Sequence, residues 1–175
     1  MNHADHVRLL QDGIPGPGGV WADLGAGDGA FTLALAELVG PGATLYAVDR
    51  ERHALRRLAD AMQARFPSVA LHTLTADFTQ PLPLPPLDGL LMANALHFVR
   101  DKLPVLRLLR QQLQPAGHLL LVEYDTDRGN RWVPYPLSLD TWQALAARAG
   151  FSETRLLATH PSRFLGRFYS AVSLP

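Results

Sequence analysis

Short apolar runs alternate with longer amphipathic segments along this chain of 175 residues, and this alternation constrains the fold more than any other feature. Strands are predicted for the runs at residues 19–24, 44–48, 69–75, 87–92 and 118–124. Helical spacing is found at residues 30–39, 51–66 and 102–113. Because the strands are apolar almost throughout, we expect a parallel sheet with helices on both faces.

The last part of the chain breaks this alternation. Ser138 is a suitable N-cap for a helix over residues 139–149, and Gly150 is a suitable C-terminal stop. Strand-like runs follow at residues 152–160 and 166–174, and the short connection between them favours an antiparallel hairpin. The sequence therefore predicts an α/β, doubly wound, Rossmann-like fold. Its sheet is predicted to have seven strands, mostly parallel and including one antiparallel strand near the end of the chain, in three αβα layers.

Composition excludes several functional classes. The 16 basic and 16 acidic residues give a formal net charge of zero, so the chain lacks the overall charge typical of nucleic-acid binding. The absence of cysteine excludes disulfides, thiolate metal sites and a cysteine nucleophile. His3 and His6 have no third plausible ligand nearby, so we expect no metal site.

Size and hydropathy indicate where such a chain works. With 47% hydrophobic residues, residues 1–175 are predicted to form a single domain around one substantial core. No stretch reaches the roughly 18 apolar residues of a membrane span, and the N-terminus has no apolar signal segment. We expect a cytoplasmic protein, monomeric or homodimeric, that binds neither membranes nor nucleic acid.

A glycine-rich turn follows the first predicted strand. In the stretch VWADLGAGDGAFTLAL, Gly25, Gly27 and Ala30 satisfy the pattern G-x-G-x-x-G/A, which is typical of nucleotide-binding turns. A tightly packed turn between a strand and a helix can also use such glycines without binding a ligand. The location after the first strand of a doubly wound sheet favours the ligand-binding interpretation.

Acidic residues follow the second and third predicted strands. Asp49 can accept hydrogen bonds from both ribose hydroxyls of a nucleoside, or it can merely cap the helix that begins near Glu51. Asp77 can accept from an exocyclic amine with Phe78 packed nearby, although turn chemistry alone also explains an aspartate there. The carboxyl ends of parallel strands share one edge, so these residues are predicted to face one rim of the sheet.

The charge of the glycine turn favours a cationic ligand. Asp23, at the strand end, and Asp28, within the turn, would both repel the pyrophosphate of a dinucleotide. S-adenosylmethionine instead carries a positive sulfur and an ammonium group, and its single carboxylate suits the free amides at a helix start. The sequence therefore predicts S-adenosylmethionine as the cofactor.

Five segments, taken together, resemble the class I S-adenosylmethionine-dependent methyltransferases in their order and spacing. They are ADLGAGDGAFTLAL, LYAVDR, TADF, LDGLLMANALHFV and LQPAGHLLLVEYD, and the likeness runs from about Val20 to the terminal hairpin. The segment NALHFV is also similar to small-molecule methyltransferases such as those of quinone biosynthesis. The resemblance implies a cofactor site formed by Asp23, Gly25, Ala26, Gly27, Asp49, Arg50, Asp77, Phe78, Asn94 and Ala95.

The same resemblance implies a role for each part of that site. The turn glycines would approach the methionine part of the cofactor, and Asp23 would lie near its ammonium group. Asp49 would hold the ribose, and Asp77 with Phe78 would hold the adenine. Asn94 and Ala95 would border the methyl group and the acceptor.

Candidate catalytic residues follow the fourth and fifth strands. His97 is the candidate general base, although it can equally be a packing residue on a helix face. Glu123, Tyr124 and Asp125 end the fifth strand on the same rim, and one or two of them can face the acceptor while the others are structural. The loop beyond them carries aromatic and guanidinium groups that can clamp a planar or anionic substrate, or it is a solvated connection with one tucked tryptophan, Trp132.

The predicted function is in-line transfer of a methyl group from S-adenosylmethionine to a small-molecule acceptor. Only a short helix over residues 3–11 and a loop precede the first strand, which indicates an open acceptor site. Two alternatives remain open at this point. One is a non-catalytic binding module with the methyltransferase fold, and the other is an NAD(P)-binding oxidoreductase.

Overall fold

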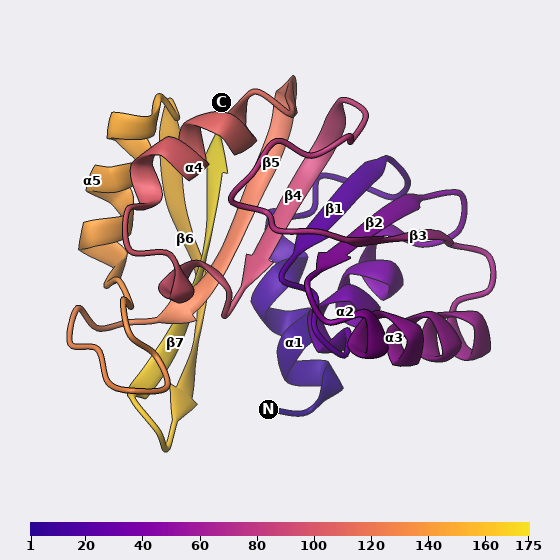
Figure 1. Ribbon diagram of the computed structural model, residues 1–175, viewed down its shortest axis with the longest axis horizontal. Coiled ribbons are helices and arrows are strands. Elements are labelled where there is room, and N and C mark those ends of the chain that lie inside the picture. The colour runs from indigo at the N-terminus through magenta and orange to yellow at the C-terminus, as the bar shows by residue number, and fades with distance from the viewer.

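The computed structural model describes all 175 residues and contains one seven-stranded sheet, with strand order β3-β2-β1-β4-β5-β7-β6. The strands are β1 (Val20–Leu24), β2 (Thr44–Asp49), β3 (Ala70–Thr75), β4 (Leu87–Ala93), β5 (Leu113–Tyr124), β6 (Glu153–Ser162) and β7 (Gly166–Leu174). Neighbours from β3 to β5 pair in parallel, whereas β7 is antiparallel to both β5 and β6 (Figure 1). The predicted mostly parallel sheet with one antiparallel strand is confirmed.

Helices cover both faces of the sheet. They are α1 (His3–Leu10), α2 (Ala30–Val39), α3 (Arg52–Arg65), α4 (Lys102–Arg110) and α5 (Leu139–Ala149), with short 3-10 helices η1 (Gln11–Gly13) and η2 (Leu96–Phe98). Figure 1 shows α4 and α5 on one side and α1, α2 and α3 on the other. None of these helices has the length and apolarity needed to cross a membrane.

Strand β5 separates the two hydrophobic cores. Leu119 and Leu121 pack with the apolar residues of α4 and α5, whereas Leu120 and Val122 pack with those of α1, α2 and α3. This alternation follows from the two-residue period of a strand, and it explains why the run is apolar at every position. The predicted αβα layering is confirmed.

The connection between α4 and β5 differs from the prediction. The helix ends at Arg110 instead of residue 113, and β5 begins at Leu113, which pairs with Leu87 of β4. The register then shifts, and regular pairing resumes at Gly89 and His118. The irregular stretch tolerates proline and glycine because no continuous ladder is needed there. Pro115 and Gly117 therefore belong to a bulged strand.

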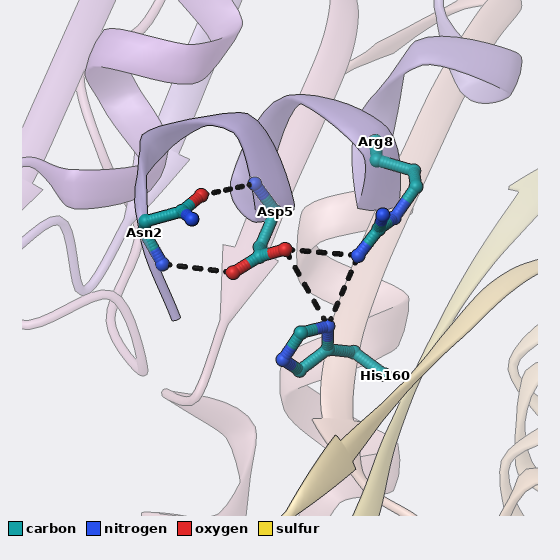
Figure 2. Close-up of polar contacts among 4 residues, drawn as sticks. All are labelled: Asn2, Asp5, Arg8 and His160. Atoms are coloured by element: carbon teal, nitrogen blue, oxygen red, sulfur yellow. Dashed lines mark hydrogen bonds and ion pairs between the residues drawn. The ribbon is translucent and has the colours of Figure 1, made fainter.

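The N-terminal helix α1 is joined to the terminal hairpin by polar contacts, as Figure 2 shows. The side chain of Asn2 accepts a hydrogen bond from the backbone of Asp5 at 3.0 Å, and Asp5 accepts one from the backbone of Asn2 at 2.9 Å. This reciprocal arrangement is a capping box, which explains why the helix begins here. Arg8 bonds to Asp5 at 2.9 Å and lies 3.3 Å from Nδ1 of His160 on β6.

Candidate active site

The glycine turn after β1 brings the ends of β1, β2 and β4 close together. The backbone nitrogens of Gly25 and Ala26 donate to the carbonyl of Val48, at 2.8 and 3.1 Å. Gly25 has a φ of +80°, and a Cβ atom at this position would lie 2.6 Å from the Cβ of Ala95. Only glycine fits both the backbone conformation and this close approach. The glycine turn and the residues after β4 are therefore in close contact at this rim of the sheet.

A cavity of about 490 Å³ opens at this rim. Its lining residues are Gly25, Asp49, Arg50, Glu51, Ala76, Phe78, Thr79, Asn94, Ala95, Phe98, Val99 and Arg100. Six of the residues that the resemblance implied for the cofactor are among them, and they come from the ends of four different strands. The other six, Glu51, Ala76, Thr79, Phe98, Val99 and Arg100, were not predicted, because side chains on connecting turns leave no periodic signal in the sequence.

Asp49 connects the glycine turn, the start of α3 and the cavity. Its Oδ2 accepts a hydrogen bond from the backbone nitrogen of Gly27 at 2.8 Å, and its Oδ1 accepts from the backbone nitrogen of Glu51 at 2.8 Å. The helix-start contact considered from the sequence is therefore present. A carboxylate can accept about four hydrogen bonds, so capacity remains on the cavity side for a ligand hydroxyl.

Asp77 is engaged by neighbours within its own turn. Its Oδ1 accepts from the backbone nitrogen and the hydroxyl of Thr79, at 2.9 and 2.8 Å, and its Oδ2 pairs with Arg50. Although burial opposes the effect, these contacts hold the pKa of Asp77 below its ordinary value. Phe78 lines the cavity and Asp77 does not, so turn chemistry accounts for the bonds that Asp77 makes.

Asn94 occupies an unusual position at the end of β4. It has a φ of +53° and is the one non-glycine residue with a positive φ. Its side-chain Oδ1 is buried without any hydrogen-bond partner in the protein, and the residue lines the cavity. A strained backbone and an unpaired buried acceptor together are typical of a site that binds a ligand. This atom fits a ligand that carries a hydrogen-bond donor.

The two acids of the glycine turn do not face the cavity, contrary to the charge argument made from the sequence. Asp23 is 3% exposed and accepts a hydrogen bond from the hydroxyl of Thr32 at 2.6 Å, and burial raises its pKa to about 7. Asp28 is exposed and forms an ion pair with Arg57 of α3. The folded turn therefore carries less free negative charge than its sequence indicates, because α3 supplies a counter-charge and burial favours protonation.

Two further turn residues lie beside the main cavity. Gly27 lines a smaller neighbouring pocket together with Asp28 and Arg57. Ala26 packs at the edge of the core formed by α1, α2 and α3. Asp23, Ala26, Gly27 and Asp77 thus shape the rim without lining the main cavity.

His97 is held by the carboxylate of Glu123, one of the three residues at the end of β5 that were expected on this rim. It lies in η2 and is 3% exposed, and its Nδ1 is 2.8 Å from Oε2 of the fully buried Glu123. Oε1 of Glu123 accepts from the backbone nitrogen of His97 at 3.1 Å. Nε2 makes no hydrogen bond within the protein. Glu123 is a charged residue within an apolar strand. A charge that is buried in this way needs a partner, and His97 is that partner.

Tyr124 and Asp125 differ in their surroundings. The ring of Tyr124 lies 4.2 Å from that of Phe168 and 6.3 Å from that of His97, measured between centroids. Asp125 accepts from the backbone nitrogen of Leu139 at 3.0 Å and from Nε of Arg167 at 2.7 Å. Tyr124 therefore lies beside His97, whereas Asp125 joins the start of α5 to the hairpin.

The loop after β5 is attached to the rim at its far end. The backbone nitrogen of Tyr135 donates to the carbonyl of His97 at 3.0 Å. Nζ of Lys102 donates to the carbonyls of Tyr135 and Val99, both at 2.8 Å. Trp132 is 70% exposed, so the interpretation of a tucked tryptophan is wrong. These bonds hold part of the loop beside the cavity while leaving the tryptophan in solvent.

Comparison with protein families identifies one match. The profile of a family described as "Methyltransferase domain" matches residues 22–119, which is more than half of the chain. The match begins in β1 and extends into β5, so it includes the glycine turn and every strand end that lines the cavity. A sequence search of curated proteins finds no match.

Solved structures share the fold at low sequence identity. A SAM dependent methyltransferase from Aquifex aeolicus is 19% identical, with a TM-score of 0.75 over 97% of this chain and 89% of that one. The YcgJ protein of Bacillus subtilis is 15% identical, with a TM-score of 0.77 over 98% of each chain. Human N-acetylserotonin methyltransferase, solved in complex with SAM, is 19% identical, with a TM-score of 0.65 over 89% of this chain and 47% of that one.

Proposed function

This chain belongs to the methyltransferase domain family, and we propose that it transfers a methyl group from S-adenosylmethionine to a small-molecule acceptor. The observation that carries the proposal is the convergence of Gly25, Asp49 and Asn94 on one cavity at the carboxyl ends of parallel strands. Its volume of about 490 Å³ is within the usual range of small-molecule sites. This is also the edge at which doubly wound sheets bind their ligands.

The cavity residues suit a nucleoside with a charged tail. Asp49 has acceptor capacity for the ribose hydroxyls, and Phe78 offers a ring for the adenine. Oδ1 of Asn94 accepts a hydrogen bond from the cofactor or the acceptor, which would satisfy its unpaired state. Asp23, Ala26, Gly27, Arg50 and Asp77 fix the surrounding turns through the contacts described above.

The chemistry requires alignment above all. When bound, S-adenosylmethionine supplies a methyl group on a positively charged sulfur, so the donor is already activated. Holding two reactants in line can supply about 7–11 kcal/mol of the barrier. The close contact between Gly25 and Ala95 supports this role because it restricts the backbone conformation at the point where the strand ends meet.

His97 is the proposed general base for an acceptor that must lose a proton. Glu123 fixes Nδ1 as the protonated nitrogen, which leaves Nε2 free to take the proton of a hydroxyl. The carboxylate then stabilises the positive imidazolium that results. Tyr124 borders this base, and Asp125 supports the loop beside it.

A titration with two classes of cofactor tests the proposal. We expect S-adenosylhomocysteine, the demethylated product, to bind the full chain with measurable heat, and NADH not to bind. Tight binding of NADH without binding of S-adenosylhomocysteine would favour the oxidoreductase alternative and overturn the proposal. Binding of S-adenosylhomocysteine without turnover of any acceptor would favour the non-catalytic module.

Other properties expected from the sequence stay predictions. These are the organisation of residues 1–175 as a single domain, a cytoplasmic location, and a monomeric or homodimeric state. The absence of nucleic-acid partners is a prediction of the same kind. Each is independent of the cofactor proposal.

A further inference from the structure

Exposed aromatic side chains gather at one end of the molecule. Six large apolar side chains are exposed in the whole chain, and four of them are aromatic: Phe98 at 62%, Trp132 at 70%, Tyr135 at 41% and Phe164 at 52%. They come from the turn after β4, the loop after β5 and the turn between β6 and β7. Figure 1 shows that these three connections lie at the same end of the sheet.

The rings of this region follow one another in a continuous row. Ring centroids are 4.3 Å apart for Phe98 and His97, 6.3 Å for His97 and Tyr124, and 6.0 Å for Tyr124 and Phe164. We call these four residues the aromatic strip. Phe98 lines the cofactor cavity, so the strip leads from the cavity to the tip of the terminal hairpin. Its two ends, Phe98 and Phe164, are the exposed members.

Two further exposed aromatic residues, Trp132 and Tyr135, lie on the loop after β5, which has defined structure. Oδ1 of Asn130 accepts hydrogen bonds from the backbone nitrogens of Trp132 and Val133, at 2.8 and 2.9 Å, and Val133 is buried. The backbone of Tyr135 is bonded to that of His97. Tyr135 is therefore held beside His97 of the strip, and the rings of both Trp132 and Tyr135 are open to solvent.

The strip has the chemistry to bind a planar ring. Exposed apolar surface gains free energy when a ligand removes it from water, and aromatic rings gain further from offset or edge contacts with another ring. Clustered exposed apolar side chains of this kind are typical of binding sites. The strip also contains His97, the proposed general base, whose Nε2 has no hydrogen-bond partner in the protein.

We propose that the aromatic strip is the acceptor subsite, and that the acceptor is a planar aromatic molecule whose nucleophilic substituent points toward the cavity. This inference rests on the proposed function, because it places the acceptor at the open end of the cofactor site. Phe98 belongs both to the strip and to the lining of the cavity. An acceptor bound on the strip must place its reacting atom in that cavity, which favours a small molecule over a protein partner. The exposed ring of Tyr135, whose backbone is bonded to that of His97, supplies further contact area for it.

The test compares a planar probe with its saturated counterpart. The full chain is loaded with S-adenosylhomocysteine and titrated with 2-naphthol or decahydro-2-naphthol. We expect 2-naphthol to bind at least about tenfold more tightly, because only the planar molecule can pack against several rings. Phe164→Ala should weaken 2-naphthol binding by roughly threefold to tenfold, as expected for the loss of one ring contact.

Two further variants separate the ring from general effects. Phe164→Leu keeps apolar area and removes the ring, and it should also weaken 2-naphthol binding. Leu156→Ala is the control, because Leu156 is exposed on β6 and lies outside the strip. It should leave 2-naphthol binding unchanged. All three variants should bind S-adenosylhomocysteine as the wild-type chain does.

The possible failures are distinguishable. A wild-type chain that binds S-adenosylhomocysteine but not 2-naphthol, or that binds both probes equally, overturns the acceptor inference alone. Wild-type affinity for 2-naphthol in Phe164→Ala or Phe164→Leu overturns it as well. A wild-type chain that does not bind S-adenosylhomocysteine overturns the proposed function, and the acceptor inference with it.

Discussion

Glu123 holds His97 by two hydrogen bonds, one of 2.8 Å to Nδ1 of the ring and one of 3.1 Å to the backbone nitrogen. Both side chains are buried, and neither oxygen of the carboxylate has another partner in the protein. The pair therefore fixes the ring tautomer and the start of η2 together. His97 lies in η2, which follows β4, and Glu123 lies near the end of β5, the neighbour of β4 in the sheet.

Replacing His97 by asparagine should separate its catalytic role from its structural one. In His97→Asn the side-chain amide can still donate to Glu123, but no base is present. We expect affinity for S-adenosylhomocysteine close to that of the wild type and turnover of a phenolic acceptor lowered by about 10²- to 10⁴-fold. Calorimetry and a methyl-transfer assay measure the two quantities. Retention of turnover by His97→Asn would show that His97 is only a packing residue.

Removing the carboxylate of Glu123 should destabilise the fold. Glu123→Leu leaves the backbone nitrogen and Nδ1 of His97 without acceptors in a buried site, at a cost of about 1–3 kcal/mol for each group. The free energy of unfolding, measured by urea titration, should therefore fall by about 1–3 kcal/mol for each of the two groups. Glu37→Leu is the matched control because it removes an exposed partner of His3, and it should change this free energy by at most about 1 kcal/mol.

Substitution of Gly25 should show the importance of the close approach at the rim. Gly25→Ala and Gly42→Ala both place a side chain at a φ near +80°, but only the Cβ at residue 25 would meet Ala95, at 2.6 Å. The backbone strain is therefore similar, and the difference between the variants reports the effect of a Cβ atom at the cavity rim. We expect Gly25→Ala to lose affinity for S-adenosylhomocysteine and Gly42→Ala to retain it. Equal affinities in calorimetry would contradict this account.

The strands and helices could be predicted because strands that are buried on both sheet faces are apolar throughout, whereas the helices that cover them have an amphipathic period. The apolar runs at β1, β2 and β4 and the amphipathic period of α2 match the predicted ranges closely. The ends of parallel strands then share an edge whatever the details of packing. That topological rule is why six of the cofactor residues that the resemblance implied lie at the cavity.

The rest of the site depends on pairings that are distant in sequence and carry no local signal. Arg57 neutralises Asp28 across 29 residues, and Glu123 holds His97 across 26. The bulge that starts β5 early exists because Leu113 pairs with Leu87, which no local propensity indicates. Burial also changes the charge of Asp23, a property that belongs to the folded state and not to the residue type.

Asp49 should contribute to cofactor affinity through a charged acceptor. Asp49→Ala removes the carboxylate that faces the cavity and holds the glycine turn. A hydrogen bond to a charged group contributes about 1.5–3 kcal/mol, so the affinity for S-adenosylhomocysteine should fall by roughly 10- to 150-fold. Asp28→Asn is the control, because Asp28 belongs to the same turn but faces Arg57. Calorimetry should show nearly unchanged affinity in the control.

Asp23 should make stability decrease as pH rises. Burial raises its pKa to about 7, the hydroxyl of Thr32 opposes this effect, and the nearby charge of Asp49 adds to it. In the unfolded chain the carboxyl titrates near its ordinary value of about 3.9. Between these values the folded chain keeps a proton that the unfolded chain releases. The free energy of unfolding therefore falls from about pH 4 to about pH 7.

The Asp23→Asn variant lacks this titration, so the difference between its unfolding free energy and that of the wild type isolates the effect of one group. We expect the wild type to lose stability relative to Asp23→Asn up to about pH 7 and then to stay level. Thr32→Val removes the hydrogen bond that favours the ionised form, so the decline should extend to higher pH. Urea titrations from pH 4 to 9 measure both curves. A difference between wild type and Asp23→Asn that does not vary with pH would show that Asp23 is ionised in the fold at all these pH values.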